Sequence, residues 1–462
     1  MYQAQPPLEF LPPKYKPWLL RLTTKLLPLW MRSQTSLTQV EAENVEVLAD
    51  LYRQFQDKKI RLMIAFRHPK TDDPIALGYL FYRLIPQIAK QKGIKFNSPI
   101  HAHFIYDRGI PLWAGSHIGW IMQNLGGTSI QRGKADWTGL KSARDIFANG
   151  IFPIAAAPEG ATNGLSEIMS PLEPGVSQMG FWCAEDLQKA GRTEQVLILP
   201  VGIKYSYVEE PWNAIASLLA ELEAASGIPP EPVYVKPPYA EGEDISHLYG
   251  RLLRLADHLL SIIENFYTKF YYRKLDNSNS DGLPSDKNEA IAIRLQAVLD
   301  VILQVAEAYF HLQPKGTLSD RCRKVEQAGW NCIFREDFKD IKGLSAVERR
   351  LGDRVAEEAN MHMWHMRLVE SFVAVTGKYV REKPTAERFA ETLLILWQMV
   401  ARITGENTSK RPVLGKQKAK IIIGEPISVT DRYAVYKGSR LGARQAVADL
   451  TKDLQVSLEG LI

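Results

Sequence analysis

The feature that most constrains the fold is a series of short apolar segments, each followed directly by polar residues. Residues 59–65 are mostly apolar and are bounded by charge, and Arg67-His68-Pro69-Lys70 follows them. An apolar run of this length is typical of a buried strand. Similar segments occupy 128–131, 151–157 and 196–204, with helical patterns between them. Strands that alternate with helices predict an α/β protein with a partly parallel sheet.

The polar clusters after these segments contain His68, Arg132 and Glu159. In open α/β sheets, ligands bind beyond the carboxyl ends of the strands. We therefore expect the three clusters to converge on one site. Arginine beside glycine at a strand end can bind a phosphate bidentately, although taken alone it favours a surface ion pair.

His68 and Asp73 are separated by four residues. Asp73-Pro74 opens an apolar run through Ile85, which predicts a helix over 74–90 with Asp73 as its N-cap. A carboxylate on one imidazole nitrogen would fix the tautomer and leave the other nitrogen free to take a proton. The pair also fits an ordinary loop histidine and a helix cap, so it does not identify a catalytic site by itself.

Composition limits the class of protein. With 462 residues, 45% of them apolar and 24% charged, the chain predicts two to three globular domains. A net charge of +5 permits contact with anionic lipid or phosphate but does not indicate nucleic acid. Three cysteines without metal or disulfide spacing favour a reducing compartment. The sequence shows no signal peptide and no apolar stretch of about 18 residues, so no membrane-spanning helix is expected.

Residues 14–32 combine Trp and Leu with Arg21, Lys25 and Arg32. This composition is typical of a helix in a membrane interface, and equally of a terminal helix packed on the protein's own core. Leu19, Leu22 and Leu26 would share one face, and Pro28 would kink or end the helix.

Two histidine pairs invite a metal interpretation, His101 with His103 and His362 with His365 near Glu358. Neither has a full ligand set, and Met and Trp at helical spacing around the second pair are typical of core packing. We expect ordinary histidines at both places and no metal.

The order of these clusters resembles the glycerolipid acyltransferases, the family of lysophosphatidic acid acyltransferases. The family's motifs are a His and an Asp separated by four residues, a Gly-containing strand ending in Arg, a Pro-Glu-Gly and an apolar strand with Pro. Over about residues 35–205 they are matched in order by His68 with Asp73, Gly127–Arg132, Pro158–Gly160 and Leu199–Gly202.

The resemblance implies transfer of a fatty acyl group from acyl-CoA or acyl-carrier protein to a lysophospholipid hydroxyl, most simply 1-acyl-sn-glycerol-3-phosphate, in phospholipid biosynthesis. His68 would be the general base and Asp73 its support, with no metal and no cofactor. Arg132, Lys70, Glu159 and Gly160 would hold the acceptor's phosphate region. The work would be done at the cytoplasmic face of a membrane by a peripheral protein.

Five positions depart from the family pattern. Arg67 and Lys70 flank His68 where the family has an Asn and a small residue, and we expect these cations to hold an anionic head group. Ala157 stands where an aromatic residue precedes Pro-Glu-Gly, and Ala161-Thr162 stands where Thr-Arg follows it.

The resemblance also implies a discontinuous domain. Residues 420–427 read like the strand that closes the family's catalytic domain, and helical patterns fill the chain before it. We therefore expect an N-terminal membrane-associating segment (1–34), an acyltransferase domain (35–240 and 415–462) and an all-helical insertion (245–412). The expected fold is a mixed sheet flanked by helices.

Two other functions remain open. The chain could be a lipid-binding or scaffold protein that keeps the fold without turnover, or an acyltransferase for a different hydroxyl acceptor. The large helical block and the departures around the first and third motifs motivate both alternatives.

Overall fold

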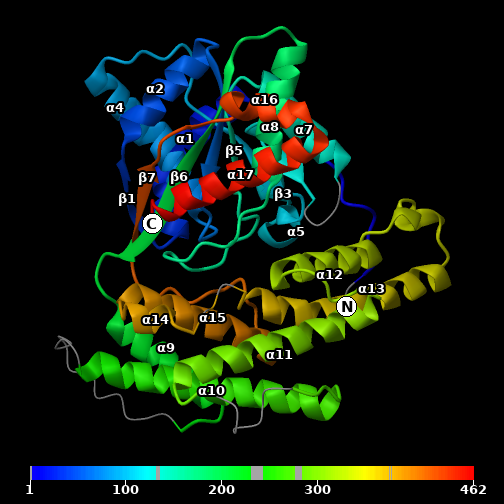
Figure 1. Cartoon of the computed structure of the whole chain (residues 1–462). Coiled ribbons are helices and arrows are strands. Elements are labelled where there is room, and N and C mark those ends of the chain that lie inside the picture. The colour runs from blue at the N-terminus through cyan, green and yellow to red at the C-terminus, as the bar shows by residue number, and fades with distance from the viewer. Residues whose placement is uncertain (1–2, 132–135, 230–242, 276–283, 374, 376) are drawn as a thin grey trace. The chain divides into compact units, whose positions relative to one another are not determined.

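The chain forms two compact units. The structure is a computed structural model that describes residues 3–131, 136–229, 243–275, 284–373, 375 and 377–462. We call 9–208 with 416–462 the sheet unit, and 209–415 with the residues up to Leu8 the helical unit. The colours of Figure 1 show the discontinuity, because the sheet unit contains both blue and red segments.

The sheet unit is built on a mixed sheet in the order β1-β7-β6-β2-β5-β3-β4, with β8 also paired to β6. Strands β6, β2, β5, β3 and β4 are mutually parallel, whereas β7 runs antiparallel to β6 and parallel to β1. Among the described residues the strands are β1 (Leu37–Glu43), β2 (Ile60–Phe66), β3 (His103–Asp107), β4 (Thr128–Ile130), β5 (Ile154–Ala156), β6 (Gln195–Tyr207), β7 (Gln417–Ile423) and β8 (Ile427–Ser428).

Both faces of this sheet are covered by helices. Alternate residues of β2 enter opposite cores: Leu62 and Ile64 pack with α2, α3 and α4, and Met63 and Ala65 pack with α7, α8 and α17. Every residue of β2 is buried, and all are apolar except Arg61, whose guanidinium donates hydrogen bonds to backbone carbonyls of Ile146, Phe147 and Gly150. The helices of this unit are α1 (Pro17–Gln34), α2 (Val45–Gln56), α3 (Asp73–Tyr79), α4 (Ile85–Lys92), α5 (Ile110–Ala114), α6 (Ser116–Asn124), α7 (Trp137–Asn149), α8 (Gly175–Lys189), α16 (Tyr433–Gly438) and α17 (Arg440–Glu459).

The strand expected at 420–427 pairs with the strand expected at 196–204, more than two hundred residues earlier in the chain. Strand β7 pairs with β6 from Tyr207↔Gln417 to Val201↔Ile423, and β1 pairs with its other edge. The sheet unit therefore contains both the strand that precedes the helical unit, β6, and the strand that follows it, β7. Its boundary lies after Val208 rather than near 240, and the first eight residues group with the helical unit rather than with 9–34.

Two helices differ from the sequence prediction. Instead of one helix over 74–90, α3 and α4 flank a π-helical turn over Leu80–Leu84, because Pro86 can donate no backbone hydrogen bond in the turn that follows. The N-cap is Asp72, and Asp73 is the first helical residue. Helix α1 continues through Pro28 to Gln34. Because Pro28 has no N–H to donate to the carbonyl of Thr24, that carbonyl accepts a hydrogen bond from Arg83 instead (3.3 Å).

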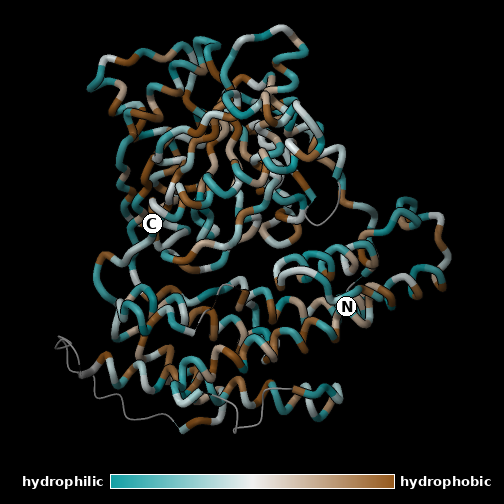
Figure 2. Tube along the Cα trace, in the orientation of Figure 1, coloured by the Kyte–Doolittle hydropathy of each residue, from teal (hydrophilic) through white to brown (hydrophobic). Residues whose placement is uncertain are grey.

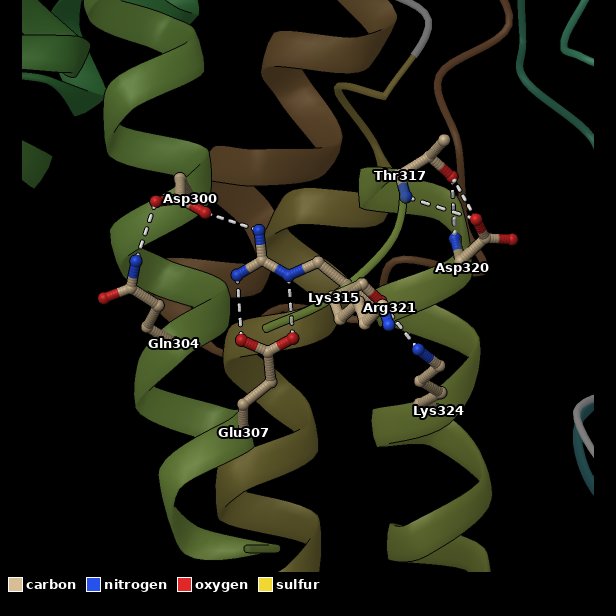
Figure 3. Close-up of polar contacts among 8 residues, drawn as sticks. All are labelled: Asp300, Gln304, Glu307, Lys315, Thr317, Asp320, Arg321 and Lys324. Carbon is tan, nitrogen blue, oxygen red and sulfur yellow. Dashed lines mark hydrogen bonds and ion pairs between the residues drawn. The ribbon is translucent and has the colours of Figure 1, made fainter. Parts of the chain in front are cut away.

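The helical unit consists of long helices joined by buried ion pairs. Arg321 of α12 donates two hydrogen bonds to Glu307 of α11 (2.7 and 2.8 Å) and pairs with Asp300 (Figure 3). In Figure 2, hydrophobic and hydrophilic residues alternate along these helices, as expected for amphipathic packing. The helices are α9 (Trp212–Ala225), α10 (Glu243–Phe270), α11 (Lys287–Tyr309), α12 (Leu318–Ile333), α13 (Ala346–Glu370), α14 (Tyr379–Glu382) and α15 (Ala386–Thr404).

The interior position of β7 predicts a large effect of shortening its inward side chains. Ile421 is fully buried, whereas its neighbour Ile422 points to the other face and is only partly buried. Ile421→Ala should lower the free energy of unfolding by about 2–5 kcal/mol, and Ile422→Ala should cost clearly less. Urea unfolding of the two variants checks this. Equal losses would show that β7 is not packed as an inner strand.

Candidate active site

His68 lies directly beyond β2, and its imidazole is bonded to a buried carboxylate. Nδ1 lies 2.8 Å from Oδ2 of Asp73, which is fully buried at the start of α3. Because an ionised carboxylate can only accept, Nδ1 carries the hydrogen and Nε2 presents its lone pair. No hydrogen bond joins Nε2 to any described residue, and the side chain is 23% exposed, so this nitrogen can meet a ligand.

The Asp73 carboxylate is held by groups on both sides. Its Oδ2 also accepts a hydrogen bond from the backbone N–H of Lys70 (3.0 Å), and Oδ1 accepts one from the hydroxyl of Tyr205. Tyr205 is buried in β6, and this burial, together with the neighbouring Asp73, raises the pKa of its hydroxyl. The phenol therefore stays neutral and donates to the carboxylate. Tyr205 was not predicted from the sequence, where it stands on the same inward face of β6 as Val201 and Ile203.

Glu159 also approaches His68, but through the backbone. Its Oε1 accepts a hydrogen bond from the His68 N–H (2.9 Å), and Oε2 accepts one from the Ser170 N–H (2.9 Å). Burial raises the pKa of this carboxyl, and nearby Arg67 and these backbone bonds oppose the rise. With both oxygens occupied and 1% of its surface exposed, Glu159 is placed to hold the His68 loop rather than to contact a phosphate.

The expectation that Arg67 holds a head group is wrong. Its side chain is fully buried, and its guanidinium donates to the carbonyls of Leu165 (2.7 Å), Ser166, Ile168 (2.5 Å) and Ile203 (3.3 Å). A cation enclosed by backbone carbonyls cannot meet a ligand in this arrangement. Its effect is to fasten the loop after β5 to the loop after β2.

Lys70 is half-buried and lies beside the strand that returns from the helical unit. Its Nζ donates to Oε1 of Gln417 (3.0 Å) and lies 4.6 Å from the ring centroid of Tyr205. Strand β7 thus contributes Gln417 to the surroundings of the His68 site. Gly160 has φ +74°, a conformation that favours glycine, in the loop that carries Glu159.

Arg132, which was expected to converge with His68, lies outside the described residues. A second arginine, Arg108, follows β3 and was not singled out from the sequence. Its guanidinium pairs with Asp136, the N-cap of α7, and its backbone N–H donates to the carbonyl of Ile130 at the end of β4 (3.0 Å). The ends of β3 and β4 are therefore joined through this arginine.

His101 and His103 bond to neighbouring groups of the fold, as expected for histidines with a structural role. His101 is bonded through Nε2 to the Leu125 carbonyl (2.7 Å) and through Nδ1 to the Tyr82 hydroxyl (2.8 Å). Burial lowers the pKa of His101 to about 4. His103 is likewise buried, with Nδ1 against the Gly126 carbonyl (2.8 Å). In the helical unit, His365 lies between the hydroxyls of Tyr267 and Tyr271, and His362 stacks on Tyr309.

No cluster of three or more His, Cys, Asp or Glu side chains able to hold a metal ion occurs in the described part of the chain. Within the same residues, no helix is both long enough and apolar enough to cross a bilayer.

Helix α1 divides its apolar residues between two faces. Leu19, Leu20, Leu27 and Met31 are buried against the sheet unit. Leu22 and Leu26 are exposed, whereas Leu19, which was predicted to share their helical face, is buried. Four exposed apolar residues form one stripe along α1: Trp18, Leu22, Leu26 and Leu29. The ring of Trp18 contacts that of Trp120 on α6, which is also exposed. Leu112 and Trp113 of α5 are exposed as well. We call these seven residues the apolar surface.

Comparison with known proteins does not identify a family. A search against protein-family models found no match, and a search of curated proteins also found none.

The burial of His101 predicts a pH-dependent contribution to stability. In the unfolded chain this imidazole binds a proton near pH 6.5, whereas in the folded chain it does so only near pH 4. The unfolded state therefore binds more protons between these values, and His101 lowers stability as the pH falls through this window, by about 3 kcal/mol at most.

His101→Gln should remove this dependence. At pH 7 the variant should be less stable than the parent protein because it packs less well, and this deficit should shrink between pH 6.5 and pH 4.5. Unfolding midpoints in urea at several pH values measure the difference. A deficit that stays constant over this range would contradict the assignment of a neutral buried imidazole.

Proposed function

We propose that the sheet unit is an O-acyltransferase that moves a fatty acyl group from a thioester to the hydroxyl of a lysophospholipid. The observation that carries the proposal is the His68–Asp73 pair at the carboxyl end of β2. A buried carboxylate fixes the tautomer, and the accessible Nε2 is left as a base. This pair also begins the motif order that resembles the glycerolipid acyltransferases.

In this mechanism Nε2 of His68 takes the proton of the acceptor hydroxyl as its oxygen attacks the thioester carbonyl. The C–O bond forms, the C–S bond breaks, and the proton held by His68 passes to the departing thiolate. General-base help of this kind contributes roughly 10²–10⁴-fold in rate. Asp73 stabilises the imidazolium that forms, and the Tyr205 hydroxyl keeps the carboxylate in place.

The acceptor in this proposal is 1-acyl-sn-glycerol-3-phosphate, and the donor is acyl-CoA or acyl-carrier protein. Lys70 and Arg132 are the proposed phosphate contacts. Glu159 and Gly160 act indirectly, because the carboxylate holds the backbone of His68 and the glycine shapes the same loop. The apolar surface, with the exposed cations Arg21 and Lys25 on α1, supports a peripheral site of action on an anionic membrane.

A lipid-binding protein without turnover is the competing proposal, favoured by the apolar surface alone. Thiol release from long-chain acyl-CoA separates the two. Release that requires the lysophospholipid supports the transferase, and release with another hydroxyl acceptor changes only the acceptor. Lipid binding without release under any acceptor supports the competing proposal.

Substitutions at the pair should separate chemistry from positioning. His68→Ala should lower kcat by about 10³-fold, since it removes the base. Tyr205→Phe should cost much less, because Asp73 keeps its bonds to His68 and Lys70. Thiol-release kinetics measure both, with circular dichroism to confirm folding. A His68→Ala enzyme with a nearly normal rate would eliminate the mechanism.

Charge on the apolar surface should weaken binding to vesicles. Leu22→Glu together with Leu26→Glu should reduce co-sedimentation with anionic phospholipid vesicles by at least about tenfold, because two Leu side chains no longer enter the interface. Leu441→Glu with Val456→Glu on α17 is the matched control, since these side chains are also exposed. If both double variants bind alike, the stripe on α1 is not the membrane contact.

A further inference from the structure

The helical unit contains an apolar cavity between α10, α11, α13 and α15. Its volume is ≈ 110 Å³. Eighteen of its twenty-three lining residues are Ala, Val, Leu, Ile, Met or Phe, and none of these described residues is charged. It shares no residue with the His68 site. An apolar cavity of about 150 Å³ stays free of water and takes up small hydrocarbons, so this lining favours an apolar ligand.

The lining residues make the cavity long and narrow. On α10 they extend from Tyr249 to Ile263, and on α11 from Asn288 to Ile302. Fourteen residues of helix span roughly 21 Å. The volume is small for that length, so the space is narrow and suits an elongated ligand.

The two ends of the cavity differ in polarity. Helices α10 and α11 lie side by side and run parallel: Tyr249 meets Asn288 near their beginnings, and Arg294 meets Glu264 further along (2.6 Å) (Figure 1). The polar lining residues Tyr249, Asn288 and Tyr379 belong to the first end. Ile263 and Ile302 belong to the other. This is the polarity of a molecule with one polar head and one hydrocarbon tail.

Hydroxyl and amide groups are present at the polar end. Asn288 is buried, and its Oδ1 accepts a hydrogen bond from the Tyr249 hydroxyl. The Tyr379 hydroxyl donates to the buried carboxylate of Glu391 (2.6 Å). Arg388 lies 4.5 Å from the ring centroid of Tyr379. The hydroxyl and amide groups can form hydrogen bonds with a polar head, and the nearest charges, Glu391 and Arg388, are of opposite sign.

We propose that this cavity is a binding site for one unbranched fatty-acid chain, with the polar head at Tyr249, Asn288 and Tyr379 and the tail directed toward Ile263 and Ile302. The site is separate from acyl transfer, and it does not require that His68 be catalytic.

Binding of dodecanoate to the full-length chain carrying His68→Ala tests the site by calorimetry, with no acyl donor present. Ala256→Phe fills the cavity from α10 and should weaken binding at least tenfold. Leu295→Phe fills it from α11 and should do the same if the first variant misfolds. Ile262→Phe, at an exposed position of α10 outside the cavity, is the matched control and should bind like the parent.

The outcomes are distinct from those of the transferase assay. No binding by the parent protein, or equal binding by the parent and both filled variants, overturns the site whatever the thiol-release result. Loss of binding in a filled variant, with retention in Ile262→Phe, supports it even if no turnover is found.

Discussion

The arrangement around His68 depends on two buried charges that fasten two loops to each other. Arg67, on the loop after β2, binds carbonyls of the loop after β5, and Glu159, on the loop after β5, binds the backbone N–H of His68. Loss of either side chain would remove one set of these contacts between the two loops. The position of the His68 imidazole therefore depends mainly on the contact between these two loops and less on strand β2.

The sequence predicted what periodicity and turn chemistry encode. The strands at 59–65 and 196–204 and the helical block over 245–412 were expected, because buried strands and amphipathic helices leave repeating apolar patterns. The pairing of 420–427 with the sheet was expected from the resemblance to the acyltransferases. Strand β1 was not recognised, since its Thr, Gln and Glu residues dilute that pattern on an edge strand. The break of 74–90 at a π-helical turn required knowing how Pro86 would be accommodated.

The site was predictable in part. The contact between His68 and Asp73 follows from their spacing between a strand and a helix. The contributions of Tyr205 and Gln417 do not, because each lies on a different strand and meets the site only through the sheet order. For Arg67 the sequence suggested a role that the fold excludes. Its charge suggested a ligand contact, whereas the fold surrounds it with carbonyl groups from residues about a hundred positions away.

The connection between β6 and β7 has a consequence for the cost of closing the chain. Strand β7 begins beside the end of β6, and the N–H of Val208 donates to the carbonyl of Lys416 (2.9 Å). Apart from the first eight residues, the helical unit thus occupies the place of a hairpin turn. Because its two ends are adjacent, changes in its length leave the strand register unchanged and alter the entropy of loop closure only slightly.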